Sequence, residues 1–136
     1  MAGFANPIGG QFSLPTSTVE LSIRCTDLSD CDFLSKSDPV AIIFGKLQGQ
    51  WRELWRSEML ANDLNPTWKS TFIHEYRFEE NQPIKIEVYD WDTSDCGVTK
   101  NLKDQDLIGR IETNMANLVS AKQYSAVLRN KSNKGL

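Results

Sequence analysis

Hydrophobic residues at every second position are the feature that most restricts how this chain can fold. Successive side chains of a β-strand point to opposite faces of the sheet, so an alternating pattern places one set on a buried face. Such a pattern runs over residues 19–25, 68–76 and 84–88. A continuous hydrophobic run over 40–44 is typical of a strand that is covered on both faces.

Weaker strand signals and one short helix complete the expected secondary structure. Residues 51–56, 107–111 and 124–128 are further candidate strands. A helix is expected over 114–120, where Asn114 can cap the amino-terminal end. Some seven short strands divided by turn residues predict an all-β fold, an antiparallel β-sandwich with one short helix near its C-terminal end.

The composition indicates one folded domain between two polar ends. Of the 136 residues, 40% are hydrophobic and 24% are charged, which is typical of a folded protein and not of a disordered one. Residues 1–16 are rich in Gly, Pro, Ser and Asn and are expected to be a flexible leader. We expect the domain over 17–130 and a C-terminal tail or linker over 131–136.

The composition also argues against several functions and locations. The net charge of −3 gives no overall attraction to nucleic acid. The first residues lack the positive charge of a secretory signal, and no hydrophobic run is long enough to span a bilayer, so we expect a cytoplasmic protein. The cysteines are odd in number and lack CxxC spacing, which predicts neither a disulfide framework nor a zinc site: they are Cys25, Cys31 and Cys96.

No pattern of catalytic residues is present in the sequence. It contains no GxSxG, P-loop or HExxH motif, and its one histidine, His74, lies in an alternating segment where a packed or surface side chain is expected. We therefore expect no enzymatic activity. Three basic residues, Lys69, Arg77 and Lys85, could form a basic strand, but glutamates are interleaved with them, and a solvated face of mixed charge is expected instead.

Five aspartates fall at the ends of the predicted strands. They are Asp32, Asp38, Asp90, Asp92 and Asp106. Loops at one end of a sandwich lie close together, and two carboxylates ~4 Å apart repel by roughly 4 kcal/mol at an effective dielectric of ~20. A cation relieves such repulsion, and Ca²⁺ accepts six to eight oxygen ligands in flexible geometry, whereas Mg²⁺ requires a strict octahedron.

The aspartates have two other possible explanations besides loops that share a calcium site. Aspartate is common in turns because its side chain bonds the nearby backbone, and this is the structural alternative to a metal site. An EF-hand is excluded, because the twelfth residue counted from Asp90 or Asp92 is Asn101 or Lys103 and not glutamate.

Four stretches in order resemble the C2 domain family over about residues 18–129. They are Asp32 with Ser37-Asp38-Pro39, then Leu64-Asn65-Pro66-Thr67-Trp68, then Val88-Tyr89-Asp90-Trp91-Asp92, and then Asp106-Leu107-Ile108-Gly109. Within the family the sequence is most similar to the first C2 domain of copines, on residues 30–39, 49–51 and 76–80. Copines carry two C2 domains followed by a von Willebrand A-like domain. The resemblance implies an eight-stranded sandwich whose loops at one end bind two or three calcium ions.

The resemblance also implies a set of ligands. Asp32 and Asp38 match the first calcium loop of the family, and Asp90, Asp92 and Asp106 match the third. The main-chain carbonyls of Cys31 and Trp91 fall where the family often supplies backbone oxygens. The third loop departs from the family pattern because it is longer than in many C2 domains.

The expected function is calcium-dependent binding to anionic phospholipid membranes. Removing the five aspartate charges from the net charge of −3 leaves +2, and two bound Ca²⁺ would bring the chain from −3 to +1. Hydrophobic loop tips would then insert: Phe33, Leu34, Trp91, Val98 and Leu102. The protein would move from the cytoplasm to the cytoplasmic face of the plasma membrane when calcium rises.

Two alternatives to this function stay open, and other proteins are further expected partners. One alternative is a protein–protein interaction module of the same fold, in which calcium has only a structural role or none. The other is the targeting domain of an enzyme whose catalytic part lies elsewhere.

Overall fold

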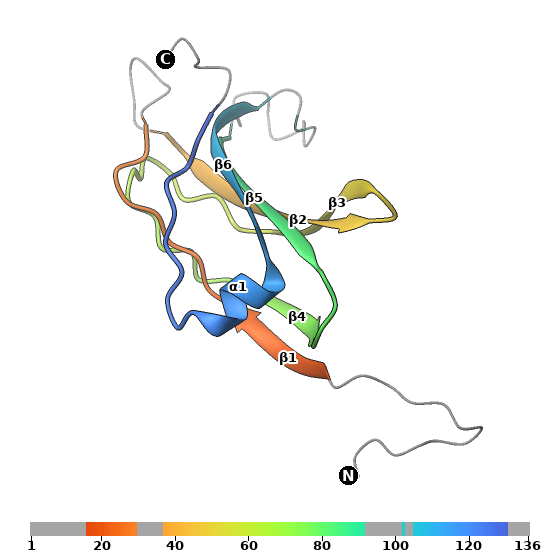
Figure 1. The fold of residues 1–136 in the computed structure, drawn as a ribbon. Coiled ribbons are helices and arrows are strands. Elements are labelled where there is room, and N and C mark those ends of the chain that lie inside the picture. Colours follow the sequence, from red (N-terminus) through yellow and green to blue (C-terminus); the bar gives the residue numbers. More distant parts are fainter. Residues whose placement is uncertain (1–15, 30–36, 92–101, 103–104, 131–136) are drawn as a thin grey trace, which may run out of the picture.

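The computed structural model describes residues 16–29, 37–91, 102 and 105–130, which form two antiparallel sheets and a short helix (Figure 1). One sheet pairs β1 with β4, and the other has the strand order β3-β2-β5-β6. The all-β, antiparallel sandwich expected from the alternating pattern is therefore confirmed. The strands are β1 (Thr16–Leu21), β2 (Pro39–Leu47), β3 (Gln50–Arg56), β4 (Phe72–Arg77), β5 (Pro83–Asp90) and β6 (Asp106–Asn114).

Strand β2 is covered on both faces, as its continuous hydrophobic run predicts. Ile43 belongs to the core between the two sheets, together with Phe72 of β4 and Ile84 of β5. Ile42 points the opposite way and packs with Tyr89 in a second cluster on the outer face of the larger sheet. Both isoleucines are fully buried. We call this second group, which also includes Val40 and Phe44, the outer cluster.

The alternating pattern of 68–76 is interrupted before β4 begins at Phe72. The reason is that the Glu58 carboxylate accepts hydrogen bonds from the main-chain amides of Lys69 and Ser70, at 2.7 and 3.4 Å. Those amides are directed to a side chain and not to a neighbouring strand. Upstream of this break, pairing resumes at an isolated bridge between Arg24 and Thr67.

The weak strand signal at 124–128 does not give a regular strand. Within the described residues, the chain pairs with β6 only directly after this segment, at one isolated bridge in which Arg110 and Arg129 exchange main-chain hydrogen bonds of 2.9 and 3.0 Å. Gly109 makes this close approach possible, because a Cβ atom there would lie 2.7 Å from the Cβ of Leu128. The last described residue, Asn130, donates a 2.7 Å hydrogen bond from its side chain to the carbonyl of Leu107.

The expected helix is confirmed as α1 (Met115–Ser120). Its N-cap is Asn114, whose side-chain oxygen accepts a hydrogen bond of 2.8 Å from the Asn117 amide. Met115 is fully buried and fixes the helix against the core between the sheets. Within the described part of the chain, no helix has the length and hydrophobicity that a membrane span requires.

Candidate metal centre

Asp38 joins three segments of the chain at one end of the larger sheet. Its main-chain amide donates to Oδ1 of Asp90 at 3.0 Å, and its carbonyl accepts from the Trp91 amide at 3.0 Å. Its own carboxylate accepts a hydrogen bond of 2.7 Å from the main-chain amide of Asn62. Asp38 therefore links the start of β2 to the end of β5 and to the β3–β4 connection (residues 57–71).

The strand register brings Asp90 and Asp106 to the same end. Asp90 is the last residue of β5 and lies opposite Pro39 in β2 and opposite Asp106, the first residue of β6. Directly paired residues on antiparallel strands lie ~4.5–5.5 Å apart. Asp38, directly before β2, therefore lies beside Asp90 and Asp106 at one end of the sheet. The sequence alone left the convergence of these three strand ends dependent on topology.

The remaining predicted ligands lie outside the described residues. These are Cys31, Asp32 and Asp92, and the predicted membrane contacts Phe33, Leu34 and Val98 also lie there. Among the described residues, no group of three or more His, Cys, Asp or Glu side chains is compact enough to hold a metal ion by itself. The ligand roles of all seven predicted residues therefore stay predictions.

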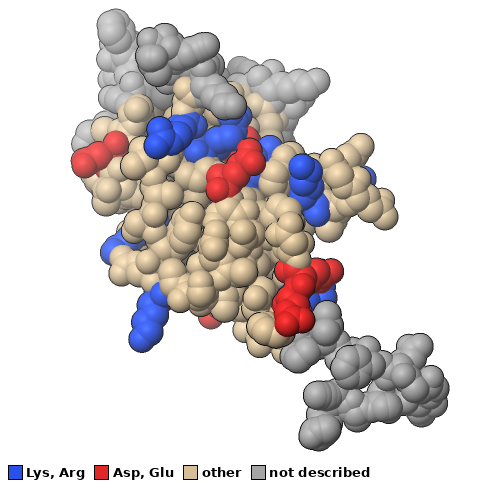
Figure 2. Space-filling view, in the orientation of Figure 1, with Lys and Arg blue, Asp and Glu red and all other residues tan. Residues whose placement is uncertain are grey.

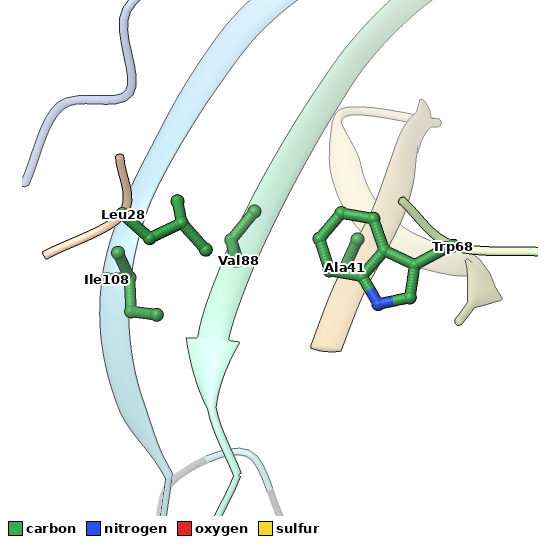
Figure 3. Close-up of a cluster of buried hydrophobic side chains, with 5 residues drawn as sticks. All are labelled: Leu28, Ala41, Trp68, Val88 and Ile108. Carbon is green, nitrogen blue, oxygen red and sulfur yellow. The ribbon is translucent and has the colours of Figure 1, made fainter. Parts of the chain in front are cut away.

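A cluster of buried hydrophobic side chains packs near this end of the sheet. Five buried side chains form a row across β6, β5 and β2, with Trp68 at the Ala41 end of the row (Figure 3). The Trp68 indole Nε1 also donates to the carbonyl of Pro39 at 3.3 Å, directly after Asp38. Trp68, the last residue of the Leu64-Asn65-Pro66-Thr67-Trp68 stretch, therefore bonds the main chain next to Asp38. The other members of the row are Leu28, Val88 and Ile108.

Trp91 and Leu102 both pack against the outer cluster. The Trp91 ring is half-buried, and the Arg56 guanidinium lies over it, 5.0 Å from the ring centroid. Leu102 is also half-buried, and its carbonyl accepts a 3.1 Å hydrogen bond from the Gln105 amide. The predicted contact of these two side chains with a membrane stays a prediction, as does the role of the Trp91 carbonyl.

The donor atoms at this end fit a hard cation. The polar side chains of Asp38, Asp90 and Asp106 at this end carry carboxylate oxygens, the ligand type that Ca²⁺ prefers. The single histidine, His74, lies in β4 and stacks on Phe72 with ring centroids 5.1 Å apart, and burial lowers its pKa. Burial also raises the pKa of the Cys25 thiol to about 11, so this sulfur is protonated at neutral pH. Neither side chain contributes a soft ligand here.

Charges of both signs are mixed over the surface in view. On the face shown in Figure 2, basic and acidic side chains are interspersed, and the middle of the face is largely uncharged. Of the residues that could have formed a basic strand, Arg77 bonds Glu80 and Lys85 lies 3.7 Å from Glu87. These ion pairs agree with the face of mixed charge that the sequence predicts.

Two residues at this end were not singled out from the sequence, Asn62 and Asp63. The Asn62 amide contacts the Asp38 carboxylate, and the Asp63 amide donates to the carbonyl of Ser37 at 3.0 Å. The only available signal was an Asn-Asp pair just before the Leu64-Asn65-Pro66 stretch, and this pattern is typical of any turn.

Comparison with known proteins identifies the family. The family model described as "C2 domain" matches residues 17–129. The chain is 36% identical over 140 residues to "Nicotinic receptor-associated protein 1" of Caenorhabditis elegans, a match that covers 90% of this chain and 22% of that protein. It is 39% identical over 116 residues to "Copine-A" of Dictyostelium discoideum, covering 85% of this chain and 18% of that protein.

A solved structure supports the same assignment. "BON1-C2B" superposes with a TM-score of 0.55 at 27% sequence identity, covering 77% of this chain and 68% of that one. The chain spans about a fifth of the length of the two relatives named above, 22% and 18%. The resemblance to copines is confirmed by these matches. The chain belongs to the C2 domain family.

Proposed function

We propose that this C2 domain binds calcium and, when calcium is bound, docks on anionic phospholipid membranes. The residues that would hold two or three ions are the carboxylates of Asp32, Asp38, Asp90, Asp92 and Asp106, with the carbonyls of Cys31 and Trp91. The observation that carries the proposal is the placement of Asp38, Asp90 and Asp106 at adjacent ends of β2, β5 and β6.

The physical reason for calcium dependence is charge. A cluster of carboxylates is repelled by a membrane surface that is itself negative. Two bound calcium ions change the net charge of the chain from −3 to +1, and phosphate oxygens can complete an open coordination sphere. In this proposal the protein moves to the cytoplasmic face of the plasma membrane when calcium rises.

Hydrophobic loop residues would add to the attraction. Phe33 and Leu34 in the first loop and Val98 in the third are proposed to enter the lipid–water boundary. Leu102 and Trp91 pack against the outer cluster, so their contribution would come from the exposed parts of half-buried side chains. We propose a binding role without catalysis, as for other binding modules of this family.

Calorimetric titration of calcium into the purified chain tests the metal site. We expect heat that saturates with calcium, and much weaker binding of Mg²⁺, because loops from distant parts of the chain suit the flexible geometry of calcium. Absence of calcium binding would reject the proposal. The acidic loops would then be better interpreted as a surface that binds another protein.

A further inference from the structure

The β3–β4 connection is fastened to the chain around Asp38 by a series of main-chain hydrogen bonds. The Leu60 amide donates to the Pro39 carbonyl at 3.3 Å, and the Asp63 amide donates to the Ser37 carbonyl at 3.0 Å. Between these two bonds, the Asn62 amide donates at 2.7 Å to the side-chain oxygen Oδ1 of Asp38. This distance between the Asn62 nitrogen and the Asp38 oxygen lies at the short end of the range for N–H···O bonds, as expected when the acceptor is a carboxylate.

The residue whose amide contacts Asp38 has an uncommon backbone conformation. Asn62 has a φ angle of +52°, in the left-handed region that most residues avoid and that asparagine tolerates. A residue without this tolerance would be strained next to the hydrogen-bonded amide. The residue type and the hydrogen bond are therefore consistent with each other.

The rest of Asp38 is held from another direction. Its amide and carbonyl are bonded to Asp90 and Trp91 at the end of β5. Its main chain is thus fixed by β5, whereas the orientation of its carboxylate is fixed by Asn62. A carboxylate that is already oriented loses less side-chain freedom when it binds a cation.

We propose that the main-chain amide of Asn62 positions the Asp38 carboxylate for the cation, so that the β3–β4 connection is coupled to calcium binding. This inference rests on the proposed function. Because coupling is reciprocal, calcium must also alter the environment of the Asn62 amide. A merely structural role for this hydrogen bond predicts a lower stability without that calcium response.

Two substitutions of Asn62 distinguish the effect of its main-chain amide on calcium binding from the effect of its side chain. Asn62→Pro removes the N–H and cannot adopt the left-handed angle, whereas Asn62→Gly keeps the N–H and adopts that angle freely. We expect the proline variant to bind calcium about tenfold more weakly, as for loss of one hydrogen bond to a charged group. The glycine variant should stay within about twofold of the parent chain.

Calorimetry on the three chains gives outcomes that can be told apart. Equal calcium affinity of the Asn62→Pro and parent chains would overturn this inference alone. Equal weakening in Asn62→Gly would also overturn it, because the side chain would then be responsible. No calcium binding by the parent chain would overturn the proposed function and, with it, this inference.

If Asn62→Pro does not fold, nuclear magnetic resonance on the parent chain still tests the inference. The amide proton of Asn62 should shift during a calcium titration with the same midpoint as the calorimetric binding curve. An Asn62 amide that does not respond to saturating calcium would overturn the inference.

Discussion

The main-chain amide of Asp38 donates a hydrogen bond of 3.0 Å to the carboxylate of Asp90, across 52 positions of sequence. The bond joins the residue before β2 to the last residue of β5. It also shows that the Asp90 carboxylate turns toward the Asp38 segment. The strand ends that flank the two predicted calcium loops therefore meet at this contact.

Replacing Asp90 by asparagine should strongly weaken calcium binding without unfolding the domain. Asparagine keeps a side-chain oxygen that can accept from the Asp38 amide, but the charge is lost. We expect calcium affinity to fall at least tenfold, and the rise in melting temperature caused by calcium to disappear. Without calcium, the melting temperature should stay the same or increase, because one repelling carboxylate is gone. Thermal unfolding with and without calcium measures both effects.

Glu112→Gln is the matched control for charge. Glu112 is an exposed residue of β6 that pairs with Lys85, toward the other end of the strand from Asp106. Glu112→Gln removes one negative charge, as Asp90→Asn does, but should leave calcium affinity unchanged. Equal losses in both variants would mean that total charge, and not the site, governs binding.

Removal of the hydrophobic side chains of Phe33 and Leu34 should weaken membrane binding but not calcium binding. In the double alanine variant we expect affinity for phosphatidylserine liposomes at saturating calcium to fall about tenfold or more, since each buried large side chain contributes roughly 1.5–3 kcal/mol. Liposome co-sedimentation measures this change. Leu47→Ala is the control, because Leu47 is 48% exposed and is the last residue of β2, at the opposite end of that strand from Asp38. Unchanged liposome affinity in the double variant would reject insertion of this loop.

Gly109→Ala should destabilise the domain more than Gly45→Ala. At Gly109 the added Cβ meets the Leu128 Cβ at 2.7 Å and the Arg129 main-chain nitrogen at 3.3 Å, so a backbone segment must move. At Gly45 the nearest atom, also at 2.7 Å, is Cδ1 at the end of the Leu54 side chain, which can rotate. We expect a loss of about 1–3 kcal/mol for Gly109→Ala and less for Gly45→Ala in urea unfolding. The reverse order would contradict the close packing of residues 128–130 on β6.

Glu58 should contribute stability that depends on pH. The Ser70 hydroxyl, followed by the main-chain amides of Lys69 and Ser70, lowers the pKa of Glu58 to about 2. Because the pKa is lower in the folded state, the stabilisation is present above the usual value of 4.5 and is lost as pH falls toward 2. The parent chain should be more stable than Glu58→Gln at pH 7, and the difference should shrink to zero near pH 2. A difference in unfolding free energy that is constant over this range would contradict the hydrogen bonding of this carboxylate.

The strands with strong hydrophobic patterns were predictable from the sequence, and those governed by side-chain hydrogen bonds were not. The run 40–44 correctly predicted a strand buried on both faces, and Asn114 correctly predicted the start of α1. The interruption at Lys69 and Ser70 depends on Glu58, eleven or twelve residues earlier. Local periodicity carries no information on such a bond. The same limit applies to 124–128, whose pairing depends on the missing side chain at Gly109.

The candidate site was predictable in part for the same reason. Aspartates at strand ends could be read from the sequence, but their convergence required the register that places Asp90 opposite Asp106. Asn62 could not be found, because its contribution comes from a main-chain amide in a left-handed conformation. A sequence indicates the contributions of charged side chains more clearly than those of backbone groups.

Liposome co-sedimentation in the presence and absence of calcium tests the central claim most directly. The parent chain and Asp38→Asn are each mixed with vesicles that contain phosphatidylserine and with vesicles of phosphatidylcholine alone. We predict that the parent chain sediments only with the anionic vesicles and only when calcium is present, and that Asp38→Asn stays in solution. Sedimentation of the parent chain that is equal with and without calcium, or that is kept in Asp38→Asn, would contradict a calcium-controlled membrane docking domain.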